Sequence, residues 1–334
     1  MQDRLQRRSI VVCLAFLAAA ACSKAPSGAS SSPRVGIVAK SLGNGFFDAV
    51  HKGADEAAAQ LGVTIVFTGP PTPTAEGQIE VVNALIAQHV DAIAISANDP
   101  DALAPSLQKA MQRGIAVLSF DSAVAGGARN AHLSPSSDAL IGATCAELAN
   151  SATGGQGTVA VVSATPTSTN QNAWLREMRT SLAKFPGVQL VDVAYGDDVS
   201  DKSYREAVGL LKRFPDLAAI VSLSSVGIVA AAKAVEDQGL SGKVKVTGLG
   251  LPSELVGYVR SGTVPQFAIW NPIDLGYSTV QVAAALIRHP QKEKERSIAA
   301  GRMGTIAFDH EGVGAMARPF IYNRDNIEQF SRIF

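Results

Sequence analysis

An excess of charge of either sign is missing from this sequence, in which 29 basic residues balance 29 acidic ones. Nucleic-acid-binding domains usually carry a basic patch or stripe, and polybasic membrane-docking surfaces need a similar excess, so the balance argues against both. Aromatic residues make up only 6% of the chain and charged residues 17%, whereas hydrophobic residues reach 47% and glycine occurs 30 times. This composition is typical of a close-packed α/β protein, and 334 residues correspond to about two domains.

Motifs of the common enzyme and metal sites are also missing. Three cysteines cannot form a disulfide framework, and none of the five histidines has a cysteine or a second histidine at metal-ligand spacing. The sequence contains no G-x-S-x-G elbow, Walker loop or H-E-x-x-H motif. Asp197, Asp198 and Asp201 lack the oxygen spacing of an EF-hand and are interpreted as a solvated loop and helix start. We expect no enzyme, metal or cofactor; Lys40 as the Schiff-base lysine of an aldolase is the enzymatic alternative.

The N-terminal segment predicts export from the cytoplasm. Arginines precede an apolar run, Ile10–Ala21, that ends in small residues as in a secretory signal peptide and is too short to span a bilayer. Its ending, Ala-Ala-Ala-Cys, resembles a bacterial lipobox, although Ala19 stands where that pattern favours leucine. We predict a signal peptide over 1–21, lipidation of Cys22 and a flexible lipid-linked tether over 22–32. The mature protein is then periplasmic or extracytoplasmic and anchored to a bacterial membrane; cleavage and release into the periplasm is the alternative.

The rest of the chain shows the same pattern of strands and helices twice. Four apolar runs separated by helical stretches recur at an offset far longer than a solenoid period, which indicates two similar domains. Runs without polar alternation indicate parallel strands covered on both faces. We predict an α/β fold of two doubly wound parallel αβα lobes that receive a ligand where the carboxyl ends of their strands face each other. The paired runs are 33–40 with 157–164, 62–68 with 187–194, 91–97 with 216–222, and 114–120 with 243–249.

Polar and aromatic residues follow the strands of the first series. Lys40 and Asn44 come after the first strand, and Phe46 and Phe47 open the next helix, where aromatic faces suit the C–H patch of a pyranose. The two phenylalanines can instead belong to the core. Asp121 follows the fourth strand and is expected to accept hydrogen bonds from ligand hydroxyls, with a loop-stabilising Asx interaction as the alternative.

The second series supplies candidates at equivalent places. Asn170 and Gln171 carry both hydrogen-bond donors and acceptors, as recognition of a polyhydroxyl compound requires. The two tryptophans of the chain, Trp174 and Trp270, both fall in segments expected at the cleft. The remaining residues expected to bind the ligand are Ser224, Ser225 and Asn271.

Several long strings of the sequence resemble the periplasmic sugar-binding proteins of ABC importers. They include AKSLGNGFFDA, ISANDPDAL, SATPTSTNQNAW, TGLGLPSELVGYVRSGTV and AIWNPIDLGY, and the resemblance covers nearly all of 33–334. Within that superfamily they are most similar to the rhamnose-binding and autoinducer-2-binding (LsrB-like) branch. The resemblance implies a type I periplasmic-binding fold, a clamshell of two lobes joined by three crossovers. It places 33–134 plus 271–316 in an N-terminal lobe and 135–270 plus 317–334 in a C-terminal lobe.

The resemblance also implies which residues form the pocket. Lys40, Asp121 and Gln171 match the pocket lysine, aspartate and glutamine of the autoinducer-2 binders. Asn170, by contrast, stands where those proteins have an aspartate. This departure weakens an assignment to autoinducer-2.

A second departure concerns the ribose binders. Asn44, Phe46 and Phe47 keep their pattern, but Gly250 replaces a ligand-binding aspartate and Trp270 a glutamine. Losing two polar groups and gaining an indole makes part of the pocket apolar, and such a wall accommodates the methyl group of a 6-deoxy sugar. L-Rhamnose is therefore the predicted ligand.

The partners implied are a monosaccharide and the permease and ATPase of an ABC importer. We expect a monomer without a nucleic-acid partner, which meets the membrane only through its lipid anchor. The alternatives are an autoinducer-2 binding protein and a sensory binding protein that feeds a receptor kinase. A sugar-responsive transcription regulator of the same fold would need a helix-turn-helix headpiece before Pro33, where this sequence has a signal peptide instead.

Overall fold

The computed structural model of the protein describes residues 32–290 and 296–333. These residues belong to one compact unit, Ser32–Phe334. The predicted signal peptide, the lipidation site Cys22 and nearly all of the predicted tether lie outside the described residues. Within the described ranges, none of the helices combines the length and the apolar character that crossing a bilayer requires.

The first lobe is built around a sheet of eight strands in the order β11-β12-β13-β5-β4-β3-β1-β2. Strands β1 to β5 and β13 are parallel, whereas β11 and β12 run antiparallel at one edge. The central parallel strands β1 and β3 are apolar and largely buried, as expected for a sheet that is covered on both faces. The bounds are β1 Arg34–Val38, β2 Thr64–Thr68, β3 Ala92–Ile95, β4 Ala116–Phe120, β5 Ala131–Ser134, β11 Arg296–Ala299, β12 Thr305–Phe308 and β13 Val313–Ala315.

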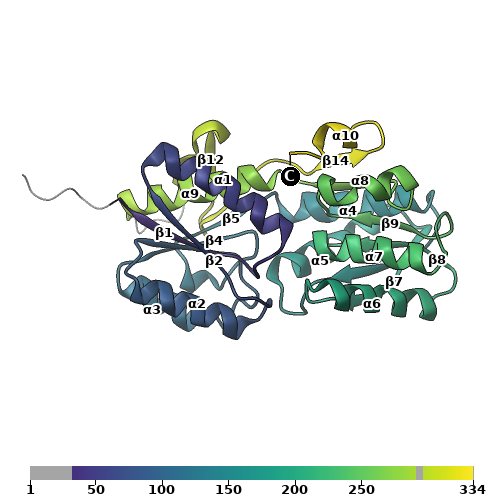
Figure 1. The fold of residues 1–334 in the computed structure, drawn as a ribbon, viewed down its shortest axis with the longest axis horizontal. Coiled ribbons are helices and arrows are strands. Elements are labelled where there is room, and N and C mark those ends of the chain that lie inside the picture. Colours follow the sequence, from purple (N-terminus) through teal and green to yellow (C-terminus); the bar gives the residue numbers. More distant parts are fainter. Residues whose placement is uncertain (1–31, 291–295, 334) are drawn as a thin grey trace, which may run out of the picture. The chain divides into compact units, whose positions relative to one another are not determined.

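Four helices cover this sheet: α1 (Gly45–Leu61), α2 (Ala75–Ala87), α3 (Ala104–Gln112) and α9 (Pro272–Arg288). Figure 1 shows α1 and α9 on one face and α2 and α3 on the other. Helices α1 and α9 lie against each other so closely that a Cβ at Gly53 would collide with the backbone of Ile273, and one at Gly276 with that of Val50. Glycine is required at these two positions because only a residue without a side chain permits this approach.

The second lobe contains a sheet of four parallel strands in the order β7-β6-β8-β9. Two antiparallel strands, β10 and β14, continue it through a single bridge between Leu249 and Ala268. Helices α4 and α5 pack together, as do α6 and α7. The bounds are β6 Gly157–Ser163, β7 Val188–Tyr195, β8 Leu217–Ser222, β9 Lys245–Gly248, β10 Gln266–Ile269, β14 Phe320–Asn323, α4 Asp138–Ala152, α5 Thr169–Leu182, α6 Ser200–Arg213, α7 Ser225–Asp237, α8 Pro252–Ser261 and α10 Ile327–Phe330.

The chain passes between the lobes more than once. It leaves the first sheet after β5, builds the second lobe up to β10, and returns with α9 against α1. Strand β13 then pairs with β5, and β14 pairs with β10. The order β2-β1-β3-β4-β5 in the first sheet and β7-β6-β8-β9 in the second are both doubly wound. The predicted α/β class with parallel sheets in two lobes is confirmed.

Candidate functional site

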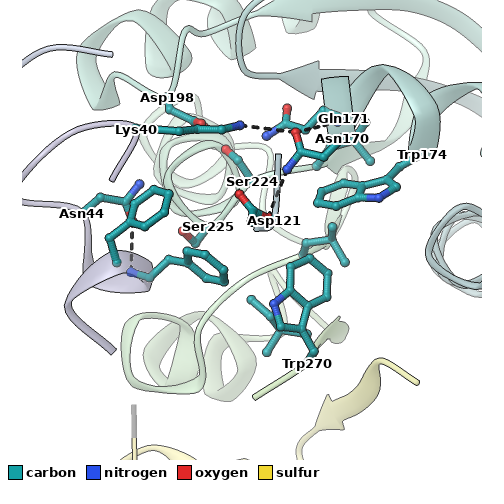
Figure 2. A pocket seen from close by; sticks show the side chains of 15 residues that line it. Lys40, Asn44, Asp121, Asn170, Gln171, Trp174, Asp198, Ser224, Ser225 and Trp270 are labelled. Atoms are coloured by element: carbon teal, nitrogen blue, oxygen red, sulfur yellow. Dashed lines mark hydrogen bonds between the residues drawn. The ribbon is translucent and has the colours of Figure 1, made fainter. Parts of the chain in front are cut away.

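A cavity lies where the strand ends of the two lobes meet. Of the residues that the sequence predicts to bind a ligand, Asn271 alone does not line it. Figure 2 shows the lining side chains. They are Lys40, Asn44, Phe46, Phe47, Asp121, Asn170, Gln171, Trp174, Asp198, Leu223, Ser224, Ser225, Leu249, Ile269 and Trp270.

A polar wall, defined here as Lys40, Asp121, Asn170, Gln171 and Asp198, forms one side of the cavity. Lys40 follows β1, and its Nζ donates a hydrogen bond to Asn170 Oδ1 on α5 over 3.3 Å. Asn170 Nδ2 in turn donates to Asp121 Oδ1, after β4, over 3.1 Å (Figure 2). The neutral amide of Asn170 therefore links a cation and a carboxylate of the first lobe to the second lobe.

Asp121 is the most constrained acid of this wall. Burial raises the pKa of its carboxyl above the ordinary value, and the charge of Asp198 adds to the effect, while Lys40 and hydrogen bonds from Ser96 and Asn170 oppose it. Ser96 Oγ donates to Asp121 Oδ2 over 2.8 Å. The backbone of Asp121 is left-handed, with φ 56°. Strained backbone of this kind concentrates at ligand sites. The side-chain partners of Asp121 lie on distant elements, so the alternative of a local Asx interaction is not what the structure shows.

Gln171 presents its amide in a defined orientation. Its Oε1 accepts hydrogen bonds from Ser163 Oγ over 2.8 Å and from the backbone N–H of Ala164 over 2.5 Å, both at the end of β6. The amide oxygen of Gln171 is therefore already hydrogen-bonded within the second lobe. The amide nitrogen is the group that Gln171 can offer to a ligand.

An apolar wall, defined here as Phe46, Phe47, Trp174 and Trp270, forms another part of the lining. Phe46 contacts Phe47 edge-on at 5.2 Å between ring centroids and Trp270 at 6.0 Å, and the two indoles are 5.4 Å apart. Aromatic pairs favour such edge contacts. Both phenylalanines are buried and line the cavity, so the core and pocket interpretations both apply.

The two indole N–H groups differ. Trp174 Nε1 donates to Asp138 Oδ1 over 3.0 Å, which orients its ring. Trp270 Nε1 is buried and has no hydrogen-bond partner. A buried donor without a partner is unfavourable, so a ligand oxygen next to Trp270 would satisfy it.

Several lining residues also begin helices. Asn44 Oδ1 accepts from the backbone N–H of Phe46 and caps α1, and Ser224 Oγ accepts from Gly227 and caps α7. Ser225 is the first residue of α7. Short polar side chains at helix N-termini are preferred because they satisfy free backbone N–H groups. Capping fixes the positions of Asn44 and Ser224 at the cavity.

Asn271 has only the capping role. Its Oδ1 accepts from the backbone N–H groups of Ile273 and Asp274, over 2.9 and 3.4 Å, and its Nδ2 donates to the Asp274 carboxylate over 2.8 Å. These bonds start α9 and direct the amide away from the lining residues. The structure therefore does not bring Asn271 together with the other predicted site residues.

Sequence reasoning missed four lining residues, Asp198, Leu223, Leu249 and Ile269. Asp198 lies in a loop before a helix, as interpreted, but it is half-buried, its Oδ1 is shielded from water, and it lines the cavity. Asp201 is exposed, as interpreted. All four follow or end a strand of the second lobe. The rule that found Asp121 therefore points to this region, but it does not separate Asp198 from the neighbouring acids. In the part of the chain that the structure describes, no group of three or more His, Cys, Asp or Glu side chains could hold a metal ion.

Comparison with known proteins identifies the family. A model of the periplasmic binding protein domain matches residues 35–292. The chain belongs to this family. Membership implies an extracytoplasmic location, and it confirms the expected resemblance to periplasmic binding proteins.

Two solved structures and one curated protein illustrate the relationship. An ABC transporter solute-binding protein from Clostridium phytofermentas with bound L-rhamnose is 34% identical, with a TM-score of 0.87 over 92% of this chain and 100% of that chain. A sugar ABC transporter protein from Actinomyces odontolyticus is 36% identical, with a TM-score of 0.71 over 90% of this chain and 98% of that chain. The D-allose-binding periplasmic protein of Escherichia coli K12 is 25% identical over 75% of this chain and 83% of that protein. These relatives are binding proteins, in agreement with the prediction that the chain is not an enzyme.

Proposed function

We propose that this chain binds a monosaccharide, L-rhamnose, in the cavity between the lobes and delivers it to the permease and ATPase of an ABC importer. The observation that carries the proposal is the contrast between the polar wall and the apolar wall within the lining of one cavity. The relative with bound L-rhamnose, which this chain covers in full at 34% identity, supports the choice of sugar.

The two walls fit complementary parts of a 6-deoxyhexose. Asp121 accepts hydrogen bonds from hydroxyl groups, and Lys40, Asn170 and Gln171 donate to sugar oxygens. The ring C–H groups and the methyl group at C6 pack against the indoles of the apolar wall. A C6 hydroxyl in the same place would lose its hydrogen bonds to water.

Ligand binding is coupled to closure of the lobes. Besides the bonds of Lys40 and Asn170, Thr167 Oγ1 donates to the carbonyl of Asn98 over 3.0 Å, and Thr169 Oγ1 donates to that of Ala123 over 3.0 Å. Both bonds join the second lobe to the first, so the structure is a closed one. A sugar that contacts both walls binds the closed state better than the open state and shifts the population toward it. The closed form is the one that the permease receives.

The remaining assignments complete this function. We propose that the signal peptide is removed, that Cys22 carries the lipid anchor, and that 22–32 forms the tether. The lobes comprise 33–134 plus 271–316 and 135–270 plus 317–334, in accord with the pairing of β13 with β5 and of β14 with β10. The protein acts as a monomer.

Isothermal titration calorimetry of the ligand-free protein tests the choice of ligand. L-Rhamnose is expected to bind tightly, while D-ribose, D-allose and autoinducer-2 bind weakly or not at all. Tight binding of autoinducer-2 without binding of L-rhamnose would favour the alternative of an autoinducer-2 binding protein. In that case Asn170 would take the place of the aspartate found in other autoinducer-2 binders. Tight binding of ribose or allose alone would also contradict the assignment to L-rhamnose.

A further inference from the structure

Asp198 has a buried carboxylate oxygen without a partner. It lies in the loop that joins β7 to α6, and its Oδ1 receives no hydrogen bond although it is shielded from water. Among the described residues, Asp198 is the only carboxylate with such an oxygen. An unpaired buried acceptor is unfavourable, and more so when it carries charge, so its presence requires an explanation.

The backbone around Asp198 holds this carboxylate in place. Asp197 and Asp198 are both left-handed, with φ 55° and 53°. The preceding residue is anchored: the backbone N–H of Asp197 donates to the carbonyl of Ala164 over 3.0 Å, and its carboxylate forms an ion pair with Lys202. Two consecutive left-handed residues without glycine are strained, and strain of this kind is retained where it positions functional groups.

Asp198 also lies close enough to Asp121 for the two charges to interact. Its charge adds to the effect of burial in raising the pKa of Asp121, so these two carboxylates of the polar wall repel each other. Figure 2 shows Asp198 on the same side of the cavity as Lys40, Asn170 and Gln171. A ligand that donates hydrogen bonds to Asp198 would offset both the missing partner and part of the repulsion.

We propose, on the basis of the sugar-binding function above, that Asp198 is a ligand-binding residue that determines specificity by accepting a hydrogen bond from one hydroxyl group of the sugar. The β7–α6 loop thereby contributes a contact to the polar wall, in addition to those from β1, β4 and α5. The unpaired oxygen makes the ligand-free protein less stable, and a sugar hydroxyl supplies the missing partner when the sugar binds.

The test compares Asp198→Asn with the matched control Asp201→Asn, which alters an exposed aspartate in the first turn of α6. Asparagine preserves the shape of the side chain and tolerates the left-handed backbone. Calorimetry with L-rhamnose is expected to show about 10–100-fold weaker binding for Asp198→Asn, because hydrogen bonds to charged groups are the strong ones. The control is expected to bind as the unaltered protein does.

The melting temperature of the ligand-free protein separates a binding role from a structural one. Asp198→Asn is expected to melt about 1–3 °C higher than the unaltered protein, because a buried charge without a partner is removed. Weaker binding together with a lower melting temperature would overturn the proposal, since it would show that Asp198 supports the loop. Unchanged binding of L-rhamnose would overturn it as well.

Deoxy sugars identify the hydroxyl group concerned. The analogues are 2-, 3- and 4-deoxy-L-rhamnose. One of them is expected to bind the unaltered protein more weakly than L-rhamnose does. In Asp198→Asn, the affinities for this analogue and for L-rhamnose are expected to be equal. Equal losses in both proteins for all three analogues would contradict a specific contact. If L-rhamnose does not bind the unaltered protein, the choice of ligand fails, and the melting temperature alone then decides: a rise supports the role of Asp198, and no change or a fall contradicts it.

Discussion

The side chains of the polar wall are held by hydrogen bonds, whereas those of the apolar wall are held mainly by ring contacts. In the polar wall, Asn170 uses both ends of its amide to connect Lys40 and Asp121 across the lobes, at 3.3 and 3.1 Å. In the apolar wall, Phe46 and Trp174 each contact Trp270 through ring edges. We therefore expect the polar wall to exchange hydrogen-bond partners when a sugar enters, and the apolar wall to provide mainly a surface of matching shape.

Because of this difference, we expect the two walls to affect different properties of sugar binding. Charged groups that are buried and hydrogen-bonded contribute strongly when a ligand pairs with them, and leave a large penalty when one partner is removed. Apolar contact discriminates only modestly between sugars that differ by one hydroxyl group. We therefore expect the polar wall to determine the affinity, its dependence on pH and which hydroxyl groups are recognised, and the apolar wall to determine the preference between a methyl and a hydroxymethyl group at C5 of the sugar.

The largest expected effect follows from Asp121→Ala in the polar wall. The change removes an acceptor for ligand hydroxyls and leaves Asn170 Nδ2 without its partner. Affinity for L-rhamnose is expected to fall by about 100-fold or more, measured by calorimetry. Asp201→Ala, on the exposed start of α6, is the control and is expected to bind normally. Similar losses in both variants would show that the cavity is not the binding site.

A smaller effect, on preference more than on affinity, is expected from Trp270→Gln in the apolar wall. Glutamine supplies polar groups where the indole offers a flat apolar face, so L-mannose, which differs from L-rhamnose by a hydroxyl at C6, is no longer rejected. The preference for L-rhamnose over L-mannose is expected to shrink by about 10-fold or more. Equilibrium titrations with both sugars measure the ratio. An unchanged ratio, with both affinities reduced equally, would contradict a selective role for the apolar wall.

The smallest expected effect is the dependence on pH. The raised pKa of Asp121 means that folding of the ligand-free protein favours its protonated form. Asp121 therefore contributes most to the free energy of unfolding at pH values below the ordinary aspartate pKa. This contribution is lost as the pH rises through the raised pKa that Asp121 has in the folded protein. Binding follows the opposite trend, because sugar hydroxyls donate to the ionised carboxylate. Affinity for L-rhamnose is expected to fall as the pH is lowered from neutrality through that pKa.

Variants of the two walls separate this effect from general acid denaturation. Asp121→Asn is expected to lose the change in affinity with pH, while Trp270→Gln retains it. Calorimetric titrations at a series of pH values above the onset of unfolding provide the measurement. If the Asp121→Asn variant kept the dependence on pH, another group would have to be responsible.

The sequence could predict most of the cavity because parallel strands end at one edge of each sheet. Lys40 and Asp121 follow directly after buried strands, and the chain's two tryptophans fall in segments at the same edge. Asp198 could not be recognised so easily, because three nearby acids in a polar stretch are typical of a solvated loop. Its side chain reaches the cavity only through two consecutive left-handed residues, which composition and periodicity do not reveal.

Other features depend on contacts that no local pattern encodes. An asparagine after a strand is compatible with both a ligand contact and a helix cap, and Asn271 is a cap. The bond between Asn170 and Asp121 forms only when the two lobes meet, so it could not be predicted from either series of strands. Whether such a residue caps a helix, contacts a ligand or bonds to the other lobe can be decided only when both lobes are placed in the folded structure.

The central claim is that the apolar wall selects a sugar with a methyl group while the polar wall holds its hydroxyls. Calorimetry of the unaltered protein with L-rhamnose and L-mannose tests it most directly, because the two sugars differ only at C6. L-Rhamnose is expected to bind about 10–100-fold more tightly than L-mannose. Equal affinities, or a preference for L-mannose, would contradict it.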